Sequence, residues 1–287
     1  MLPEWLAIKP ATTERYDEVR QSMLSSGTCT VCVEAHCPNM SECWSSGTAT
    51  FMILGDTCTR GCRFCNVKKG ASGAEVDGSE PGRLAGIIRK WKLNYVVLTS
   101  VCRDDLADQG SSHFAACIER IRLENPKTVI EVLIPDFEGN VSCLQKIVDA
   151  QPDVIGHNIE TVERLTPTVR DRRANYSQSL EVLRRSKSLG KKVYTKSAMM
   201  LGLGETEDEV LSAFKDLRTA NVDFLAVGQY LRPATRNIEV KEYVNPEQFD
   251  RLKVRALEFG FLYVASGPFV RSSYRAGEYF TNALIHK

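Results

Sequence analysis

ATFMILGDTCTRGCRFCNV, residues 49–67, is the stretch from which the fold and chemistry of this chain are most directly predicted. Its apolar part, Phe51 to Leu54, predicts a short buried strand, and the following Gly55-Asp56 ends that strand in a loop. The loop carries three cysteines with the spacing C-x3-C-x2-C, at Cys58, Cys62 and Cys65. Three thiolates so close together can hold a zinc ion or a four-iron cluster, because both prefer soft sulfur ligands.

The number of available ligands separates these two metal centres. A structural zinc ion needs a fourth cysteine or histidine, and no such residue follows close behind Cys65. Three cysteines on a four-iron cluster leave one iron open for another molecule. The spacing resembles that of the radical S-adenosylmethionine enzymes, in which the amino and carboxylate groups of S-adenosylmethionine fill the open iron. A structural zinc site or buried free thiols are the alternative interpretation.

Length and composition indicate a soluble globular enzyme. The chain has 287 residues, 43% hydrophobic and 25% charged, with a net charge of +1, so nothing favours nucleic acid or a membrane surface as a general partner. No apolar run approaches the length of a membrane-spanning helix. The first twenty residues, MLPEWLAIKPATTERYDEVR, resemble neither a signal peptide nor a transit peptide. We therefore expect a cytoplasmic protein, and we expect a monomer.

From residue 50 onward, short apolar strands alternate with amphipathic helices. The predicted strands lie at 50–54, 95–99, 128–134, 153–157, 193–200 and 223–228, and the predicted helices at 82–92, 112–124, 140–150, 177–189 and 206–220. A helix near 246–259 and a strand at 261–265 follow. This α/β alternation predicts a parallel sheet curved into a partial (β/α)6 barrel related to the TIM barrel; a doubly wound open sheet is the alternative. We expect an N-terminal extension at 1–48 with a helix at 14–23, the barrel at 49–245, and a C-terminal extension at 246–287.

Polar residues follow several of the predicted strands. Ser100 and Arg103 come after the second strand, and Asn158 and Glu160 after the fourth. In barrels of this kind the carboxyl ends of the strands converge on the active site. Each of these residues taken alone is explained equally well as a cap or a turn residue, but their repetition at equivalent places favours a site at this end of the barrel.

A second cysteine motif lies upstream, with Cys32, Cys37 and Cys43 spaced C-x4-C-x5-C. It also lacks an obvious fourth thiolate, and Cys29 is the nearest spare cysteine. Two such motifs predict two clusters. Together with VCVEAHCPNMSECW (31–44), TSVCRDDLADQG (99–110), HNIETV (157–162), GLGET (202–206) and RSSY (271–274), they make the chain resemble the lipoyl synthase family over almost its whole length.

This resemblance implies two 4Fe-4S clusters and S-adenosylmethionine as cofactors. It further implies that the cluster on Cys58, Cys62 and Cys65 would cleave S-adenosylmethionine, and that the resulting 5′-deoxyadenosyl radical would remove hydrogen from C6 and C8 of an octanoyl chain. By the same resemblance, an auxiliary cluster on Cys32, Cys37, Cys43 and a serine of the RSSY motif would supply the sulfur and be consumed. That serine is assigned to Ser272, with Ser273 left open as the alternative. Arg271 would then lie where its guanidinium can hold a carboxylate or a cluster sulfide.

The resemblance also suggests which residues contact S-adenosylmethionine. Asn158 and Glu160 would hydrogen-bond its ribose, and Arg170 or Arg173 would pair with its carboxylate. Backbone between Ser100 and Arg103 would receive its amino group. An ordinary salt bridge or helix cap is the alternative for each of these residues.

The partners implied are octanoylated lipoyl carrier domains, such as those of 2-oxo acid dehydrogenase E2 subunits and of the glycine cleavage carrier protein. A one-electron donor such as ferredoxin or flavodoxin, and iron–sulfur carrier proteins, are also implied. Residues 164–196 hold ten Arg or Lys but only Asp171 and Glu181 as acids, which suits an acidic carrier domain. For Arg184, Arg185 and Lys187, a solvent-exposed helix face is a better explanation than a docking surface. Few aromatic residues interrupt this stretch, which disfavours nucleic acid.

Two other functions are compatible with paired cysteine motifs. An electron carrier of the ferredoxin type would use four cysteines for each cluster on a short chain, unlike this one. A radical enzyme resembling biotin synthase would share the C-x3-C-x2-C loop but lack the upstream motif and RSSY. The content of iron, sulfide and zinc separates these alternatives.

Overall fold

The computed structural model of the chain describes residues 3–6, 39, 42–43, 49–190, 192–274 and 276–277. Within them a seven-stranded parallel sheet has the order β1-β4-β5-β6-β7-β8-β9. Its strands are β1 (Ala49–Ile53), β4 (Tyr95–Ser100), β5 (Val129–Leu133), β6 (Val154–Gly156), β7 (Tyr194–Leu201), β8 (Phe224–Gln229) and β9 (Tyr263–Gly267). Strands β2 (Thr57–Cys58) and β3 (Lys68–Lys69) form a separate parallel pair.

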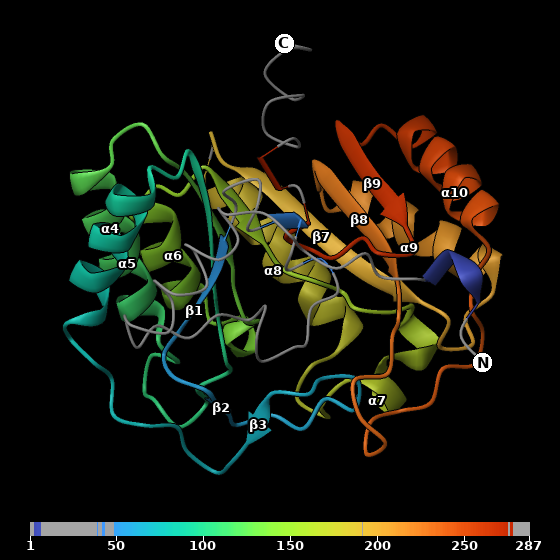
Figure 1. Cartoon of the computed structure of the whole chain (residues 1–287), viewed down its shortest axis with the longest axis horizontal. Helices are drawn as coiled ribbons and strands as arrows, with labels where there is room; N and C mark the ends of the chain where they lie inside the picture. Colours follow the sequence, from blue (N-terminus) through green and yellow to red (C-terminus); the bar gives the residue numbers. More distant parts are fainter. Residues whose placement is uncertain are drawn as a thin grey trace.

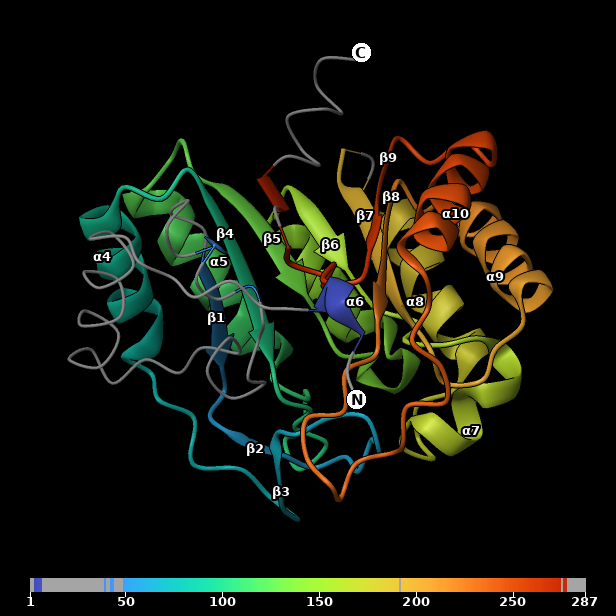
Figure 2. The same cartoon turned by 45° about the vertical axis from the view of Figure 1, so that its right-hand side comes forward.

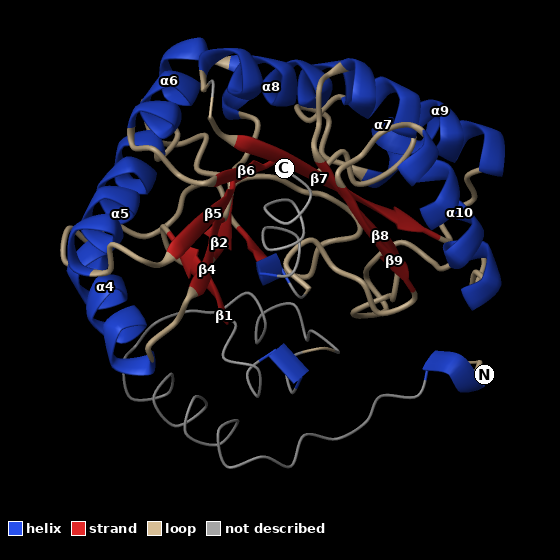
Figure 3. Ribbon diagram, turned by 90° about the horizontal axis from the view of Figure 1, so that it is seen from above, coloured by secondary structure: helices blue, strands red, loops and turns tan. Residues whose placement is uncertain are grey.

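The helices lie on the outer side of the sheet. They are α4 (Glu80–Trp91), α5 (Ser111–Glu124), α6 (Val141–Asp149), α7 (Thr166–Val169), α8 (Tyr176–Leu189), α9 (Glu207–Thr219) and α10 (Pro246–Glu258). Three short 3-10 helices are η1 (Glu4–Leu6), η2 (Phe137–Gly139) and η3 (Glu163–Leu165). Seen from above, the helices form an arc around the strands (Figure 3). A doubly wound sheet would carry helices on both faces, so the partial barrel is confirmed.

The barrel is open on one side. Among the described residues, β1 and β9 each pair with a single neighbour, so they form the two edges of the curved sheet (Figure 2). The six predicted strand–helix units are present, and the predicted helix boundaries agree within a few residues. The chain from 246 to 267 continues the same alternation through α10 and β9, so this part of the expected C-terminal extension belongs to the sheet. The helix expected at 14–23 lies outside the described residues.

Local sequence explains where several helices begin. The Asn175 side chain accepts a hydrogen bond from the Gln178 N–H at the start of α8. Thr206 and Glu209 form a reciprocal capping box at the start of α9, which satisfies two N–H groups that no helical carbonyl can reach. Asn140 and Asn245 cap α6 and α10 with single hydrogen bonds, accepted from the backbone N–H groups of Ser142 and Glu247. These caps fix the lengths of the loops that lead from the strand ends into the helices.

Two apolar clusters hold the sheet against the helices. One packs Phe51 of β1 with residues of α4, α5 and α6 such as Phe114, and the other packs Leu225 of β8 with residues of α9 and α10 such as Phe249. Burial of such side chains contributes roughly 1.5–3 kcal/mol each. No helix among the described residues is long and apolar enough to cross a membrane.

The inside of the barrel contains a buried ion pair toward the amino ends of the strands. Lys196 on β7 places its Nζ 2.9 and 3.1 Å from the carboxylate oxygens of Glu131 on β5, and both side chains are 2% exposed. The Tyr95 hydroxyl on β4 donates to Glu131 at 2.5 Å. Three strands are therefore joined by one polar network inside the sheet.

Segments near the two ends of the chain lie side by side. The Asn39 amide donates to the Phe269 carbonyl at 2.5 Å, and the Tyr274 hydroxyl is 3.1 Å from the Glu42 carboxylate. These contacts join positions more than 200 residues apart. They bring the segment that carries Cys43 to the segment that carries Ser272.

Candidate active site

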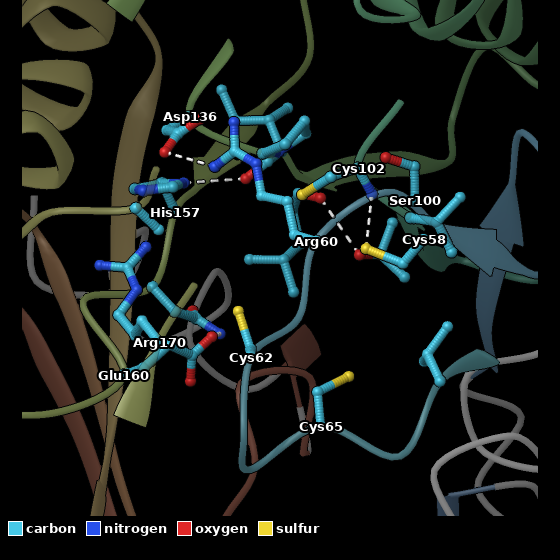
Figure 4. A pocket seen from close by; sticks show the side chains of 18 of the residues that line it. Cys58, Arg60, Cys62, Cys65, Ser100, Cys102, Asp136, His157, Glu160 and Arg170 are labelled. Carbon is cyan, nitrogen blue, oxygen red and sulfur yellow. Dashed lines mark hydrogen bonds and ion pairs between the residues drawn. The ribbon is translucent and has the colours of Figure 1, made fainter. Parts of the chain in front are cut away.

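The three cysteines predicted to hold a cluster lie on one loop at the carboxyl ends of the strands. We call residues 58–66 the cluster loop. Cys58, Cys62 and Cys65 all line a cavity of about 250 Å³, together with residues from the ends of β4, β5 and β6. Figure 4 shows these cysteines on one side of the cavity and Glu160 and Arg170 on the other. The loop therefore presents three soft ligands toward one shared cavity.

Arg60 anchors the cluster loop to two strand ends. Its side chain is 3% exposed, and its guanidinium donates to Asp104 at 2.8 Å and to Asp136 at 2.7 Å. Thr59 adds a hydrogen bond of 2.7 Å to Asp104. Burial is the largest single influence on each carboxyl and would raise its pKa, but the hydrogen bonds and positive charge of Arg60, together with weaker neighbouring contributions, lower the pKa of both Asp104 and Asp136. The charged network holds the loop backbone beside its cysteines.

A second set of contacts anchors the loop from the segment after α7. The Gly61 N–H donates to the Asp171 carboxylate at 2.6 Å, and the Asp171 N–H donates to Cys62 Sγ at 3.3 Å. Arg173 donates to the Thr59 carbonyl at 2.6 Å and also binds Asp171. The loop is thus fixed at Arg60 and again at Cys62.

Cys58 has a neighbouring thiol that does not belong to the cysteine motif. The Cys102 N–H donates to Cys58 Sγ at 3.4 Å, and the two side chains also hydrogen-bond each other. Donation from the Cys102 side chain lowers the pKa of Cys58 to about 6, although burial opposes the shift. The same hydrogen bond, with burial, raises the pKa of Cys102. Cys58 therefore has the more readily formed thiolate of the pair.

The other two cysteines of the loop favour the protonated form. Burial raises the pKa of Cys62, and it raises the pKa of Cys65 to about 11. A thiol must lose its proton to bind a metal, and a bound cation supplies the charge that permits this. The site is thus suited to a cationic cluster that supplies compensating charge.

The opposite wall of the cavity is polar and partly buried. Asn158 Nδ2 donates to Glu160 at 3.2 Å, and burial raises the pKa of Glu160. Glu160 has φ of 66°, a left-handed conformation that is held by its N–H on the Ala198 carbonyl and its carbonyl on the Met200 N–H. Strain of this kind in a non-glycine residue is typical of functional sites.

Arg170 and His157 lie deeper on the same wall. Arg170 NH1 donates to Ser179 Oγ at 2.8 Å, and His157 Nε2 lies 2.9 Å from the same hydroxyl. Burial lowers the pKa of His157 to about 4, and the nearby Arg170 acts in the same direction. His157 is therefore neutral at physiological pH, and Arg170 brings a fixed positive charge to the cavity.

The cavity contains four of the six residues proposed to contact S-adenosylmethionine. Ser100, Asn158, Glu160 and Arg170 line it, whereas Arg103 and Arg173 do not. The Arg103 guanidinium turns away to bind Asp105 and the Leu54 carbonyl, and Arg173 binds Asp171. Of the two arginines left open for the carboxylate, the structure thus brings Arg170 to the cavity. The Ser100 hydroxyl is buried without a hydrogen-bond partner among the described residues.

These observations test whether a cluster and S-adenosylmethionine fit the site. Three sulfur atoms suit the irons, and a guanidinium, a carboxylate and an amide suit the carboxylate, amino and hydroxyl groups of the ligand. An orphaned buried hydroxyl at Ser100 is a group that a bound molecule would satisfy. The residues present therefore fit both groups.

Several important residues were not predicted from the sequence. No role at the site was assigned from the sequence to Arg60, Cys102, Asp104, Asp136 or His157, although all of them lie at the cavity or its anchors. The available signal was weak. Asp136 follows Pro135 directly after a predicted strand, and Cys102 and Asp104 belong to the motif after the second strand.

The described residues include only part of the predicted auxiliary cluster site. Cys32 and Cys37, with the spare Cys29, lie outside the described residues. Cys43 is partly buried against the first apolar cluster, and Ser272 and Ser273 are both partly exposed after β9. The contacts of Asn39 and Glu42 with the segment 269–274 place Cys43 and Ser272 on neighbouring segments.

Comparison with known proteins now identifies the family. The model of the radical SAM superfamily matches residues 52–217, which is more than half of the chain. A lipoyl synthase of Myxococcus xanthus is 51% identical over 285 residues, covering 99% of this chain and 95% of the relative. The chain belongs to the lipoyl synthase family. Membership of the radical SAM superfamily implies a 4Fe-4S cluster and S-adenosylmethionine.

Other members of the lipoyl synthase family are longer than this chain. An apicoplast lipoyl synthase of Plasmodium knowlesi is 50% identical over 99% of this chain, which spans 64% of that relative's length. The mitochondrial lipoyl synthase 1 of Drosophila yakuba is 49% identical, and the chain covers 76% of it.

Solved structures support the fold. Methylornithine synthase matches with a TM-score of 0.55 at 13% identity, covering 83% of this chain and 81% of that one. The FeFe-hydrogenase maturase HydG of Carboxydothermus hydrogenoformans matches with a TM-score of 0.60 at 14% identity, covering 86% and 63%. At such low identity these likenesses concern the barrel alone.

Proposed function

We propose that this chain is a lipoyl synthase, which inserts two sulfur atoms at C6 and C8 of an octanoyl chain attached to a lysine of a lipoyl carrier domain. The observation that carries the proposal is the cavity lined at once by Cys58, Cys62 and Cys65 and by Glu160 and Arg170. The identity of about 50% with lipoyl synthases over 99% of the chain supports the same reaction.

The chain's own residues would bind and orient the cofactors. Cys58, Cys62 and Cys65 would hold the loop cluster, and Arg60 and Asp171 would keep their backbone in position. When bound, the cluster and S-adenosylmethionine supply the one-electron bond cleavage that removes hydrogen atoms from the octanoyl chain.

The polar wall would hold S-adenosylmethionine. Arg170 would pair with its carboxylate, and Asn158 and Glu160 would accept and donate hydrogen bonds at its ribose. Backbone and hydroxyl groups around Ser100 would receive its amino group. Met52 and Leu133 line the same cavity with apolar surface, which suits an alkyl chain and excludes water from it. No residue here need act as a general base on carbon.

The sulfur source is the second part of the proposal. An auxiliary 4Fe-4S cluster would be held by Cys32, Cys37, Cys43 and Ser272, with Ser273 as the competing ligand. The hydrogen bonds that join Asn39 to Phe269 and Glu42 to Tyr274 support this assignment, because they hold the two ligand-bearing segments together. An alkoxide oxygen is a harder ligand than a thiolate, so it would leave iron more readily.

Variants of the two cysteine motifs test whether one cluster cleaves S-adenosylmethionine and the other supplies sulfur. Cys58→Ala should abolish formation of 5′-deoxyadenosine, because the loop cluster would no longer assemble. Cys43→Ala should keep part of that activity but yield no lipoyl product, and its iron and sulfide content should fall by one cluster. Lipoyl product from Cys43→Ala would refute the auxiliary cluster as sulfur source. A normal yield of 5′-deoxyadenosine from Cys58→Ala would refute the loop cluster itself.

Ser272→Ala and Ser273→Ala form a matched pair for the fourth ligand. The ratio of lipoyl-peptide to 5′-deoxyadenosine, measured anaerobically on an octanoyl-lysine peptide, should fall in Ser272→Ala and stay at the wild-type value in Ser273→Ala. The reverse result would move the ligand to Ser273. Wild-type ratios in both variants would remove serine from the mechanism.

The cellular setting belongs to the proposal as well. Octanoylated carrier domains, a one-electron donor and iron–sulfur carrier proteins would be the partners, and the chain would act as a monomer. The cytoplasmic location stays a prediction, since relatives include forms named for mitochondria and the apicoplast. Fractionation of cells that express the natural protein tests it.

A further inference from the structure

The cluster loop has an outer face as well as the face that lines the cavity. A separate groove of about 550 Å³ lies against that outer face. Residues that line it include Arg63, Thr168, Arg232, Arg236, Ile238 and Lys241. Figures 1 and 2 both show the segment after β8 running beside α7 and the β2–β3 pair, at the end of the barrel that carries the cluster loop. We call this groove, with its lining residues, the basic groove.

Hydrogen bonds join the wall of the basic groove directly to the backbone of the cysteines. The Ile238 N–H donates to the Arg63 carbonyl at 3.0 Å, and Asn237 Nδ2 donates to the Cys65 carbonyl at 3.0 Å. Arg236 donates to Asn66 at 2.9 Å. A molecule seated in the groove would therefore be separated from the cluster ligands by little more than the thickness of one loop.

The groove is lined mainly by positively charged side chains. Four of its lining residues are Arg or Lys, and Glu239 is the single carboxylate among them. Arg232 lies 3.8 Å from Glu239. Arg63 and Arg236 donate instead to neutral groups, and within the described part of the chain neither of them, nor Lys241, forms a salt bridge. The whole chain has a net charge of only +1, so this excess is local. The positive electrostatic potential of these side chains attracts acidic proteins and speeds their association.

We propose that the basic groove is the docking surface for an acidic one-electron donor protein that reduces the loop cluster. The inference rests on the proposed function, since that reaction consumes electrons at the cluster. One electron leaves the reduced centre of the donor and enters the cluster, so the donor is oxidised and the cluster reduced by one electron. No atom is transferred and no covalent bond forms between the two proteins.

The position of the groove favours an electron donor over the acidic carrier domain. An octanoyl chain must enter the inner cavity to meet the reacting groups, and the groove lies on the opposite face of the loop. An electron needs no opening, because it can cross a thin layer of protein, and its transfer slows steeply with distance. The outer face of the loop is therefore where a bulky donor reaches the cluster without obstructing S-adenosylmethionine or the substrate.

Lys241→Glu is the most informative variant. Lys241 lines the groove, but none of the hydrogen bonds described between its wall and the cluster loop comes from its side chain. Lys253→Glu on the exposed face of α10 makes the same change of charge far from the groove and serves as the control. Formation of 5′-deoxyadenosine is measured for each protein with two reductants, dithionite and a reduced acidic flavodoxin.

With flavodoxin at low salt, Lys241→Glu should form 5′-deoxyadenosine about tenfold more slowly than wild type. Added salt should reduce this difference in rate, because it screens the attraction and so slows the wild-type reaction. With dithionite, which needs no docking surface, the two proteins should be equal. Lys253→Glu should match wild type with both reductants. Binding of flavodoxin, measured by calorimetry without turnover, should weaken by a similar factor in Lys241→Glu alone.

Three results would overturn the proposal. Equal rates and equal flavodoxin binding in wild type and Lys241→Glu would show that the donor docks elsewhere. An equal loss with both reductants would show that Lys241 supports the loop instead. A raised KM for the octanoylated carrier domain in dithionite assays would assign the groove to the carrier. If wild type forms no 5′-deoxyadenosine even with dithionite, the proposed function itself fails, and the docking proposal fails with it.

Discussion

Two buried charge networks lie at different levels of the barrel. At the carboxyl ends, Arg60 joins the cluster loop to Asp104 and Asp136, after β4 and β5. Toward the amino ends, Lys196 and Glu131 pair across β5 and β7 inside the barrel. Both networks bury a cation against carboxylate oxygens, two carboxylates for Arg60 and one for Lys196, with shortest distances below 3 Å. They differ in what they connect: the first joins a loop to the sheet, whereas the second joins strands to strands.

This difference predicts that replacing a residue of the first network and replacing a residue of the second will have different consequences. Strand positions are already fixed by backbone hydrogen bonds and apolar packing, so the Lys196 network affects mainly the free energy of unfolding. The cluster loop has the short β2–β3 pairing and a few isolated backbone hydrogen bonds, such as that from the Arg63 N–H to the Val169 carbonyl. Its geometry therefore depends more on side chains such as Arg60 and Asp171. We therefore expect the first network to govern activity and the second to govern stability.

Lys196→Met should give the largest effect on stability. It leaves the Glu131 carboxylate buried without its cation, which costs about 3–5 kcal/mol. The double variant Lys196→Met/Glu131→Leu should recover most of that loss, because neither charge remains. Chemical denaturation measures the free energies. The folded fraction of either variant should still form 5′-deoxyadenosine, and a selective loss of that activity would erase the distinction between the two networks.

Arg60→Lys should lower activity more than stability. An ammonium group keeps the buried charge, but it cannot reach Asp104 and Asp136 together as the guanidinium fork does. A displaced loop should reduce 5′-deoxyadenosine formation by about a hundredfold, as small misplacements of reacting groups do. Anaerobic rates and denaturation curves measured on one preparation provide the test. A stability loss as large as that of Lys196→Met, with normal rates in the folded protein, would contradict it.

His157 makes the stability of the site wall depend on pH. Its pKa is lowered to about 4 in the folded chain, from 6.5 for a free histidine, so the unfolded chain binds the extra proton first. This contribution is fully present above pH 6.5 and is lost as the pH falls toward 4, amounting to roughly 3 kcal/mol. His157→Gln should flatten the difference in stability between pH 7 and pH 5. Glu160, whose raised pKa acts in the opposite sense, remains unchanged in both proteins.

Cys102→Ala should change activity and stability least of these variants. It tests whether Cys102 is only a neighbour of Cys58 or a ligand of the cluster. Without the Cys102 thiol, the pKa of Cys58 should rise from about 6 toward its ordinary value. Iodoacetamide should then alkylate Cys58 in the cluster-free protein about two- to fivefold more slowly at pH 7, because less thiolate is present. Cys143→Ala, which removes a buried thiol under α6, is the control. Iron content should match wild type, and a loss of iron would make Cys102 a ligand.

Much of the fold could be predicted from local patterns in the sequence. Apolar runs of five to eight residues between amphipathic stretches predicted the six strand–helix units, because each element must bury one side. The spacing of Cys58, Cys62 and Cys65 predicted the ligand loop for the same reason of locality: three positions within eight residues necessarily lie close together. The polar residues Ser100, Asn158 and Glu160 were predicted at the site because parallel strands end at one edge.

Contacts between distant positions were decided by the tertiary structure alone. Arg60 and Asp136 are 76 residues apart, and no pattern in either segment indicates their 2.7 Å contact. Arg103, Arg170 and Arg173 are equivalent as sequence letters, yet the first binds Asp105, the last binds Asp171, and Arg170 alone faces the cavity. The physical reason is that a guanidinium binds whichever carboxylate lies within reach, and the packing of the barrel determines which one does.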